Sequence, residues 1–262
     1  EYFNLKFVIK ILKKYGPADI VTANNVFAHI NDIERVVKGV YELLKPNGVF
    51  IIEVPYLVDV LEKNLFDTVY HEHFSYFALT PLRRYFAKFN MYVYDVERVS
   101  THGGSLRAYV TKDKKVLHTS NVHKLLAIEK RLKLDQLTTY QGFAKRIRKN
   151  KFDLMSLLTR LKKSHKIIVG YGAPAKGNTL LNYFNITSKY IDFIVDDSVY
   201  KQGLFTPGTH IPVVSPDKLT HQLPDYMLIL AWNFADSIMQ KYAFLKKQGV
   251  KLSWQDGEVG TR

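Results

Sequence analysis

The run Val49-Phe-Ile-Ile-Glu-Val54 is nearly continuous in apolar residues, as expected of a strand in a sheet covered on both faces. It follows a helical pattern that begins near Asn31 or Asp32 and ends at Pro46-Asn-Gly48. A shorter apolar run, Ile20-Val-Thr-Ala23, precedes this helix and predicts a buried strand. Strand, helix and strand within about 35 residues predict a βαβ unit and a parallel α/β sheet.

A helix and a hairpin are predicted next. Pro81 to Phe89 has helical spacing. The alternating runs Tyr92 to Val99 and Ser105 to Thr111 then predict an antiparallel hairpin around Thr101-His-Gly-Gly104.

The remainder of the chain begins with helix and returns to an α/β pattern. Residues 121–164 are helical in pattern almost throughout, and neither Gly nor Pro occurs there before Gly142. A second α/β unit starts at Lys166, with strands expected over 167–169, 191–195 and 226–231. The predicted organisation is a first α/β domain over residues 1–114, a helical connector over 115–165 and a Rossmann-like domain over 166–262.

The composition excludes several classes of protein. The chain has 262 residues, 47% of them apolar, and no cysteine, so it can bury cores but cannot form disulfides or thiolate zinc sites. It has no apolar run of about 18 residues and no signal-peptide pattern, which predicts a cytoplasmic protein that does not bind membranes. The charge of +14 comes from lysines scattered over helices and turns without recognition-motif spacing, so we expect no nucleic-acid partner.

A glycine-rich turn opens the predicted second domain. Gly170-Tyr-Gly-Ala-Pro-Ala-Lys-Gly-Asn178 follows a strand and starts a helix, where backbone N–H groups and the helix N-terminus favour a phosphate. Lys176 adds a positive charge, and Asp196 and Asp197 follow the next strand, where an acid can bind a ribose. The spacing differs from the dinucleotide fingerprint and lacks the Lys-Ser/Thr pair of a P-loop. The alternative is a tight turn that only joins a strand to a helix.

The stretch Asp67-Thr-Val-Tyr-His-Glu-His-Phe-Ser-Tyr76 carries the densest acid–base chemistry. On a helix Tyr70 and His73 would share a face, whereas on an extended segment His71 and His73 would share a side, with Tyr70 and Glu72 opposite. A neutral His73 can accept a proton, and an adjacent carboxylate can fix its tautomer. Zinc is less favoured, because H-x-H supplies two ligands and the H-E-x-x-H spacing is absent. The alternative is a structural contribution of these rings to a domain seam.

Two loops at the predicted carboxyl edge of the first sheet add polar groups. Asn24-Asn-Val-Phe-Ala-His29 follows the strand that ends at Ala23, and open α/β sheets bind ligands at this edge. Thr101-His-Gly-Gly-Ser-Leu-Arg107 joins two glycines to a cation near the same edge. The alternatives are a packing contribution of His29 and an ordinary hairpin loop.

The chain resembles the sugar C-methyltransferase family. Members use S-adenosylmethionine to methylate a ring carbon of a nucleotide-linked 4-keto-deoxysugar. The resemblance implies an α/β fold that joins the C-terminal part of a class I methyltransferase sheet, a helical connector and a Rossmann-like nucleotide-sugar-binding domain. It rests on four motifs in the family's order, Asn25-Val-Phe-Ala-His29, Tyr70-His-Glu-His73, His102-Gly-Gly-Ser-Leu-Arg107 and Gly170 to Asn178, and is extended by Asp197, Lys201-Gln-Gly203 and Pro207-Gly-Thr-His-Ile-Pro212.

The resemblance implies what particular residues do. Methylation at carbon requires a base, for which His73 is the candidate, and a donor to the enolate oxygen, for which Tyr70 and His29 are candidates. Glu72 would orient a neighbour or bind a sugar hydroxyl. The residues assigned to the cofactor are Asn24 and Asn25, and those assigned to the substrate are Tyr76, Gly104, Arg107, Gly170, Gly172, Lys176, Asp196 and Asp197.

The start of the chain departs from the family pattern. Members begin with a cysteine-rich zinc-binding domain and a Gly-rich loop for S-adenosylmethionine. Neither precedes residue 1, so we expect no metal and no main cofactor-binding loop. A fragment, a split protein with a separate N-terminal half chain and a degenerate relative would each begin in this way. The alternative function is a non-catalytic nucleotide-sugar-binding protein or subunit derived from this family.

Overall fold

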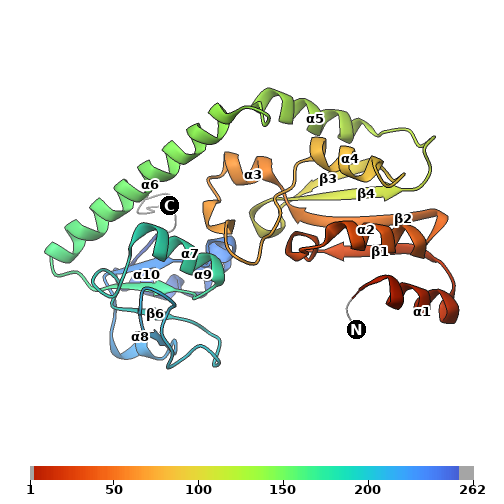
Figure 1. The fold of residues 1–262 in the computed structure, drawn as a ribbon. Helices are drawn as coiled ribbons and strands as arrows, with labels where there is room; N and C mark the ends of the chain where they lie inside the picture. The colour runs from red at the N-terminus through yellow and green to blue at the C-terminus, as the bar shows by residue number, and fades with distance from the viewer. Residues whose placement is uncertain (1–2, 254–262) are drawn as a thin grey trace. The chain divides into compact units, whose positions relative to one another are not determined.

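A computed structural model describes residues 3–253 and confirms the mixed α/β class (Figure 1). Contacts divide the described chain into two compact units, which are residues 3–65 with 71–141, and residues 66–70 with 142–253. The predicted helical connector is shared between them. Its first helix belongs to the first unit, and most of its second helix belongs to the second.

The first unit is built on a four-stranded sheet of order β1-β2-β4-β3. Strands β1 and β2 are parallel and flank helix α2, while β3 and β4 form an antiparallel hairpin, which confirms the predicted βαβ unit and hairpin. Its elements are α1 (Leu5–Tyr15), β1 (Ala18–Asn24), η1 (Phe27–His29), α2 (Ile33–Leu43), β2 (Leu44–Pro55), α3 (Leu57–Glu62), α4 (Leu79–Ala87), β3 (Tyr92–Val99), η3 (Thr101–Gly103), β4 (Ser105–Thr111) and α5 (Ser120–Leu132).

Helix α2 is closed at both ends by side chains. Asp32 is its N-cap and accepts a hydrogen bond of 3.0 Å from the N–H of Arg35, as one of the two predicted caps. At the other end, the ammonium of Lys112 donates to the carbonyls of Tyr41 at 2.9 Å and Leu44 at 2.5 Å. These bonds satisfy carbonyls that lack partners within the helix and so fix its length.

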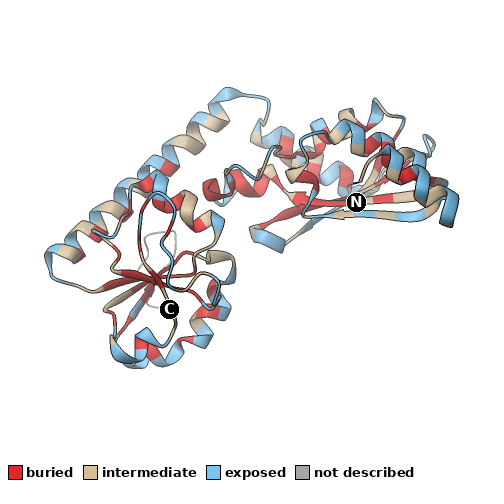
Figure 2. Cartoon of the chain, turned by 60° about the horizontal axis from the view of Figure 1, so that its bottom comes forward, coloured by how far each residue is buried: buried red, intermediate tan, exposed pale blue. Residues whose placement is uncertain are grey.

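Only one face of this sheet joins the hydrophobic core. Phe50, Ile52 and Val54 are buried on that face, whereas Val49 and Ile51 on the other face are partly exposed (Figure 2). The prediction of a sheet covered on both faces is therefore wrong for β2. The prediction of a buried first strand is also wrong, because β1 pairs only with β2 among the described residues and none of its residues is buried.

The second unit is a parallel five-stranded sheet of order β7-β6-β5-β8-β9. The strands β7 and β9 have two and three residues, too few for a pattern search to detect. The elements are η2 (Phe66–Thr68), α6 (Leu137–Lys163, from residue 142 on), β5 (Ile168–Tyr171), α7 (Ala175–Phe184), β6 (Phe193–Val195), β7 (Val213–Val214), α8 (Lys218–His221), β8 (Tyr226–Ile229), η4 (Trp232–Phe234), α9 (Ala235–Lys241), α10 (Ala243–Lys247) and β9 (Lys251–Ser253).

The helical segment breaks at a residue that the sequence pattern did not mark. Helix α5 ends at Leu132, and its C-cap residue Lys133 takes the left-handed conformation with φ of 52°. The hydroxyl of Thr139 donates to the carbonyls of Leu132 and Lys133 at 2.9 Å each, which holds the turn. Gly142, the first glycine of this segment, lies inside α6.

Candidate functional site

Two histidines meet in the first unit. His29 ends η1, directly after β1, and His73 lies in the loop before α4. Their ring centroids are 4.8 Å apart and the planes are inclined by 63°. The ring of Tyr76 is 6.2 Å from that of His73, and all three side chains are half-buried. The structure therefore brings together three of the predicted site residues from distant parts of the chain.

The core holds both histidine segments in place. Phe27, two residues before His29, is fully buried and its ring is 5.5 Å from that of Phe77. The N–H of Phe74 donates to the carbonyl of Ala28 at 3.0 Å, which ties the two segments together beside the histidines. The imidazoles thus extend from backbone that is fixed by apolar packing, as a site with defined geometry requires.

The other residues of the motif Tyr70-His-Glu-His73 do not join His29 and His73 in one site. Residues 71 and 72 form a turn and residues 73–76 are irregular, so neither the helical nor the extended geometry considered for the motif is present. The side chains of His71 and Glu72 are exposed. Tyr70 is grouped with the second unit, whereas His73 belongs to the first.

Asn25 and Glu53 occupy the carboxyl ends of β1 and β2. Asn25 has φ of 53°, its N–H donates to the carbonyl of Glu53 at 2.8 Å, and its amide donates to the Glu53 carboxylate at 3.4 Å. Asn24, at the end of β1, is exposed. Glu53, which is 4% exposed, was not among the predicted site residues. The sequence feature that could have indicated Glu53 is a single carboxylate in an otherwise apolar strand.

Arg107 pairs with two carboxylates inside the sheet. Its guanidinium donates to Glu53 at 2.8 and 3.0 Å and to Glu97 at 3.2 Å, since the three residues are paired across β2, β4 and β3. Burial acts to raise the pKa of Glu53, but hydrogen bonds from Arg107, Thr101 and Asn25 outweigh it and hold the pKa below its ordinary value. The guanidinium of Arg107, which we assigned to substrate binding, is therefore already paired with two carboxylates of the protein.

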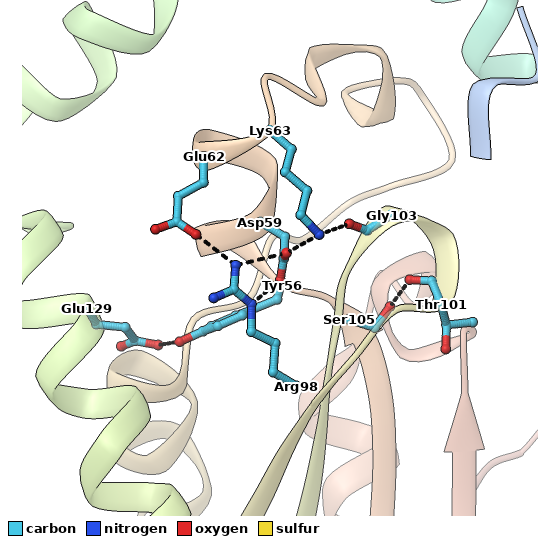
Figure 3. A network of polar contacts seen from close by, with 9 residues as sticks. All are labelled: Tyr56, Asp59, Glu62, Lys63, Arg98, Thr101, Gly103, Ser105 and Glu129. Atoms are coloured by element: carbon cyan, nitrogen blue, oxygen red, sulfur yellow. Dashed lines mark hydrogen bonds and ion pairs between the residues drawn. The ribbon is translucent and has the colours of Figure 1, made fainter. Parts of the chain in front are cut away.

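Gly104 is required by packing against Asp59. Its φ of 143° disfavours other residues, and a Cβ atom there would come within 2.1 Å of the Asp59 carboxyl carbon. Asp59 is fully buried and is held by Arg98 through two bonds of 2.9 Å and by Lys63 at 2.7 Å (Figure 3). This packing accounts for the glycine without a ligand, and its assignment to substrate stays a prediction.

The glycine-rich turn of the second unit already holds an internal anion. The carboxylate of Asp196, which is 8% exposed, accepts the N–H of Ala173 at 2.7 Å and that of Ser198 at 2.8 Å, and pairs with Lys201 at 3.2 Å. Gly172 has φ of 84°, and its N–H donates to the carbonyl of Val195 at 2.7 Å. These contacts support the alternative of a structural turn for the first part of the loop.

Two of these glycines are also needed for close packing. A Cβ atom on Gly170 would lie 2.8 Å from a side-chain carbon of Ile194, and one on Gly177 would lie 3.2 Å from Leu230. The substitution of Gly170 would therefore disturb the sheet before it tested any ligand, and that of Gly177 would push α7 slightly away from Leu230.

Asp197 is bound to neighbouring side chains in the same way. Lys241 donates to both of its oxygens at 2.7 Å, and the hydroxyl of Tyr171 donates at 2.7 Å. The hydrogen bond from Lys241, joined by that from Tyr171, holds the pKa of Asp197 below its usual range. A ribose would have to compete with these partners, and the assignment of Asp197 to substrate stays a prediction.

Lys176 lies beside Trp232 and the buried Asp67, neither of which was predicted to meet it. Its ammonium is 5.2 Å from the ring of Trp232, whose indole N–H donates to the fully buried Asp67. Burial lowers the pKa of Lys176, and the charge of Asp67 partly opposes this shift. Phe66 stacks on Phe184 with ring centroids 5.1 Å apart, which fixes Asp67 beside helix α7.

Residues 3–253 contain no group of three or more side chains from His, Asp and Glu that could hold a metal ion. No helix in the same described range is both long and apolar enough to cross a bilayer.

Comparison with known proteins gives two family matches and a relative. Residues 3–96 match the family described as a methyltransferase domain, and residues 100–254 match the C-methyltransferase C-terminal domain. C-methyltransferase NovU from Streptomyces niveus is 38% identical over 244 residues, which are 92% of this chain and 58% of the relative. The chain thus spans little more than half the length of the curated relative that it matches.

The two matches meet within the first unit, because β4 lies in the second match although it pairs with β2 and β3. The first covers the strands β1, β2 and most of β3, and is consistent with a class I Rossmann-like methyltransferase fold. The second covers more than half of the chain, including all strands of the second unit. The chain belongs to the S-adenosylmethionine-dependent C-methyltransferase family.

Proposed function

We propose that this chain is the enolate-forming part of a cytoplasmic C-methyltransferase that acts on a nucleotide-linked 4-keto-deoxysugar. The observation that carries the proposal is the pair of imidazoles, His29 and His73, whose centroids are 4.8 Å apart. His29 follows the carboxyl end of a parallel strand, where ligands bind in open α/β sheets. The name of the relative supports methyl transfer to carbon.

The proposed reaction begins with proton removal. A carbon next to a ketone becomes nucleophilic only after it loses a proton, so neutral His73 accepts that proton and the electron pair moves to the ketone oxygen. His29 donates a hydrogen bond to this oxygen as negative charge develops on it. The further contributions of Tyr70 as a donor and of Glu72 as an orienting group rest on the family resemblance alone.

The first unit also offers groups for the cofactor. S-adenosylmethionine, when bound, supplies an electrophilic methyl group. The side-chain oxygen of Asn25 is buried and has no hydrogen-bond partner within residues 3–253, so it is available to accept from a bound ligand. Asn24 is exposed beside it at the end of β1. These two residues fit the proposed contact with the cofactor.

A separate contact is proposed in the second unit, where the glycine-rich turn would meet the nucleotide diphosphate. Asp196 already accepts the N–H of Ala173, so Lys176 is the residue that would contact a phosphate. An anion beside its ammonium would offset the effect of burial, which acts against the charged form.

We further propose that polypeptide outside this chain completes the cofactor site. Strand β1 has one edge without a partner among the described residues, and the second face of its sheet is only partly covered. Ile20 on this strand is 60% exposed. An added strand would satisfy the free N–H and C=O groups of that edge. The greater length of the relative is consistent with such a part.

The exchange of a sugar hydrogen with solvent tests the proposed base without the cofactor. We expect the chain in D2O to place deuterium next to the ketone of a thymidine diphosphate 4-keto-deoxysugar, and His73→Asn to abolish this exchange with little change in sugar-nucleotide affinity. His71→Asn is the matched control, because His71 is exposed two residues earlier. Exchange at the wild-type rate in His73→Asn, measured by proton NMR, would remove His73 from the mechanism.

A further inference from the structure

A groove runs along one side of α6 in the second unit, away from every residue assigned above to cofactor or substrate. Its volume is about 890 Å³, and it is lined by α6 residues from Arg148 to Ser164 and by Tyr190. The lining residues Arg148, Phe152, Met155, Thr159 and Lys163 recur at intervals of three or four. They therefore form one stripe along the helix.

Helix packing leaves this stripe open. Ile147, Leu154, Leu158 and Leu161 form the buried side of the helix. Phe152 lies on the groove side and is 71% exposed. A phenyl ring exposed to this degree on a helix that already has a buried side is a candidate contact for a partner.

The charges of the groove all have one sign. Arg148 and Lys151 line one end, Arg160 and Lys163 line the other, and no Asp or Glu is among the described lining residues. Lys151 donates to the carbonyl of Tyr183 at 2.6 Å. The other three cations form no ion pair within residues 3–253, so their charges are available to a ligand.

The spacing of the two basic ends limits what can occupy both. Arg148 and Arg160 are about 18 Å apart along the helix axis at the rise of an α-helix. The phosphates of a diphosphate share a bridging oxygen, so a small nucleotide would reach only one end. Phe152 and Met155 lie between the ends, and an occupant that covers them needs an apolar centre.

We propose that this groove docks an acidic segment of a protein partner, with carboxylates at both ends and an apolar side chain in the middle. The carboxylates meet Arg148 and Lys151 at one end and Arg160 and Lys163 at the other. The apolar side chain covers Phe152. None of the residues that line this groove is among the proposed catalytic residues.

A pair of synthetic peptides of about 16 residues, about 24 Å long as helices, tests the proposal by fluorescence anisotropy. The first carries two Glu at each end and Leu-Phe at the centre, and the second has the same composition with all Glu at one end. We expect the full chain to prefer the first peptide. We also expect Arg148→Glu with Arg160→Glu to weaken its binding about tenfold or more, and Phe152→Ser to weaken it as well.

Matched variants control for net charge and for exposed aromatic area. Arg35→Glu with Arg131→Glu makes the same charge change at exposed residues of the first unit, and Phe205→Ser removes a ring that is 62% exposed. Both should bind as the wild type does. The proposal is overturned if the first peptide does not bind, if both peptides bind equally, or if the groove variants leave its affinity unchanged. Tighter binding of an oligothymidylate that is lost in the same groove variants would assign the groove to nucleic acid instead.

Discussion

Glu53 shows how one carboxylate is kept charged inside a sheet. Its side chain is 5% exposed, and a buried charge of this kind is costly unless it is paired. Arg107 supplies two N–H groups, and the amide of Asn25 adds a third donor. The ion pair thus links the carboxyl ends of β1 and β2 to β4, next to the residues proposed for the cofactor.

The replacement of Arg107 should make stability depend on pH in a defined direction. The pKa of Glu53 lies below its ordinary value in the folded protein, so its contribution is present above the unfolded pKa and is lost as pH falls through the folded pKa. Arg107→Met leaves the carboxylate buried and unpaired. We expect a loss of about 2 kcal/mol near pH 7, below the range for fully buried pairs, and a smaller loss near pH 4, because the carboxyl of the variant has lost the guanidinium and takes up a proton more readily.

Hydrogen exchange of the β2 and β4 amides at the two pH values measures this loss. Arg84→Met, a change of the same kind on the exposed side of α4, should be nearly neutral at both. An equal loss at both pH values would show that the pair with Glu53 is not its source.

Helix α4 depends on a side chain from another helix. Its N-cap residue, Ala78, has no capping side chain, and its first turn has no acidic residue. Glu129 on α5, 3% exposed, fills this function by accepting the N–H of Leu79 at 2.5 Å and that of Thr80 at 2.8 Å. It also accepts the hydroxyl of buried Tyr56 at 2.8 Å (Figure 3). The loop that carries His73 leads directly into this helix start.

The removal of this cap should loosen α4. Glu129→Ala leaves several buried donors without an acceptor, and we expect a loss of about 3 kcal/mol, with a smaller loss in Glu129→Gln, which keeps one acceptor oxygen. Faster hydrogen exchange of the backbone amides of Leu79 and Thr80 would show that α4 has loosened. Lys130→Ala, at the neighbouring exposed residue, is the control. Unchanged exchange in Glu129→Ala would mean that solvent satisfies these donors.

At the scale of the whole molecule, the first sheet has an edge that association can use. Strand β1 has seven residues, includes no proline and pairs only with β2 among the described residues. Its one charged residue, Asp19, is paired with Lys45 at 2.8 Å. Natural sheets usually protect such edges with charges, prolines or bulges.

The chain by itself should therefore self-associate through this edge. We expect the sedimentation coefficient to rise with concentration, and Ile20→Lys to suppress the rise because it places a charge on the strand. Leu117→Lys is the control, since Leu117 is 87% exposed in the loop after β4. A wild-type chain that remains monomeric over the whole concentration range would show that the edge does not associate.

The parts of this protein that follow a local pattern could be predicted from the amino-acid sequence. Periodicity located the βαβ unit, the hairpin and the second α/β sheet, since each has its own repeat of apolar residues. Residue type and position limited the cap of α2 to Asn31 or Asp32, and the structure shows that it is Asp32. The order of the motifs identified the family. It also indicated His29, His73 and Tyr76 as site residues, although no local pattern predicts how far apart their rings lie.

The partners of those side chains became known from the folded molecule. Whether β1 is buried depends on which strands lie beside it, and helix α5 stops before Lys133, whose own backbone takes the left-handed conformation. The partners of Glu53 and Glu129 come from 54 and 73 positions away in the sequence. Contacts of this kind form when the core packs, because a buried polar group must form hydrogen bonds with the groups that the fold places beside it.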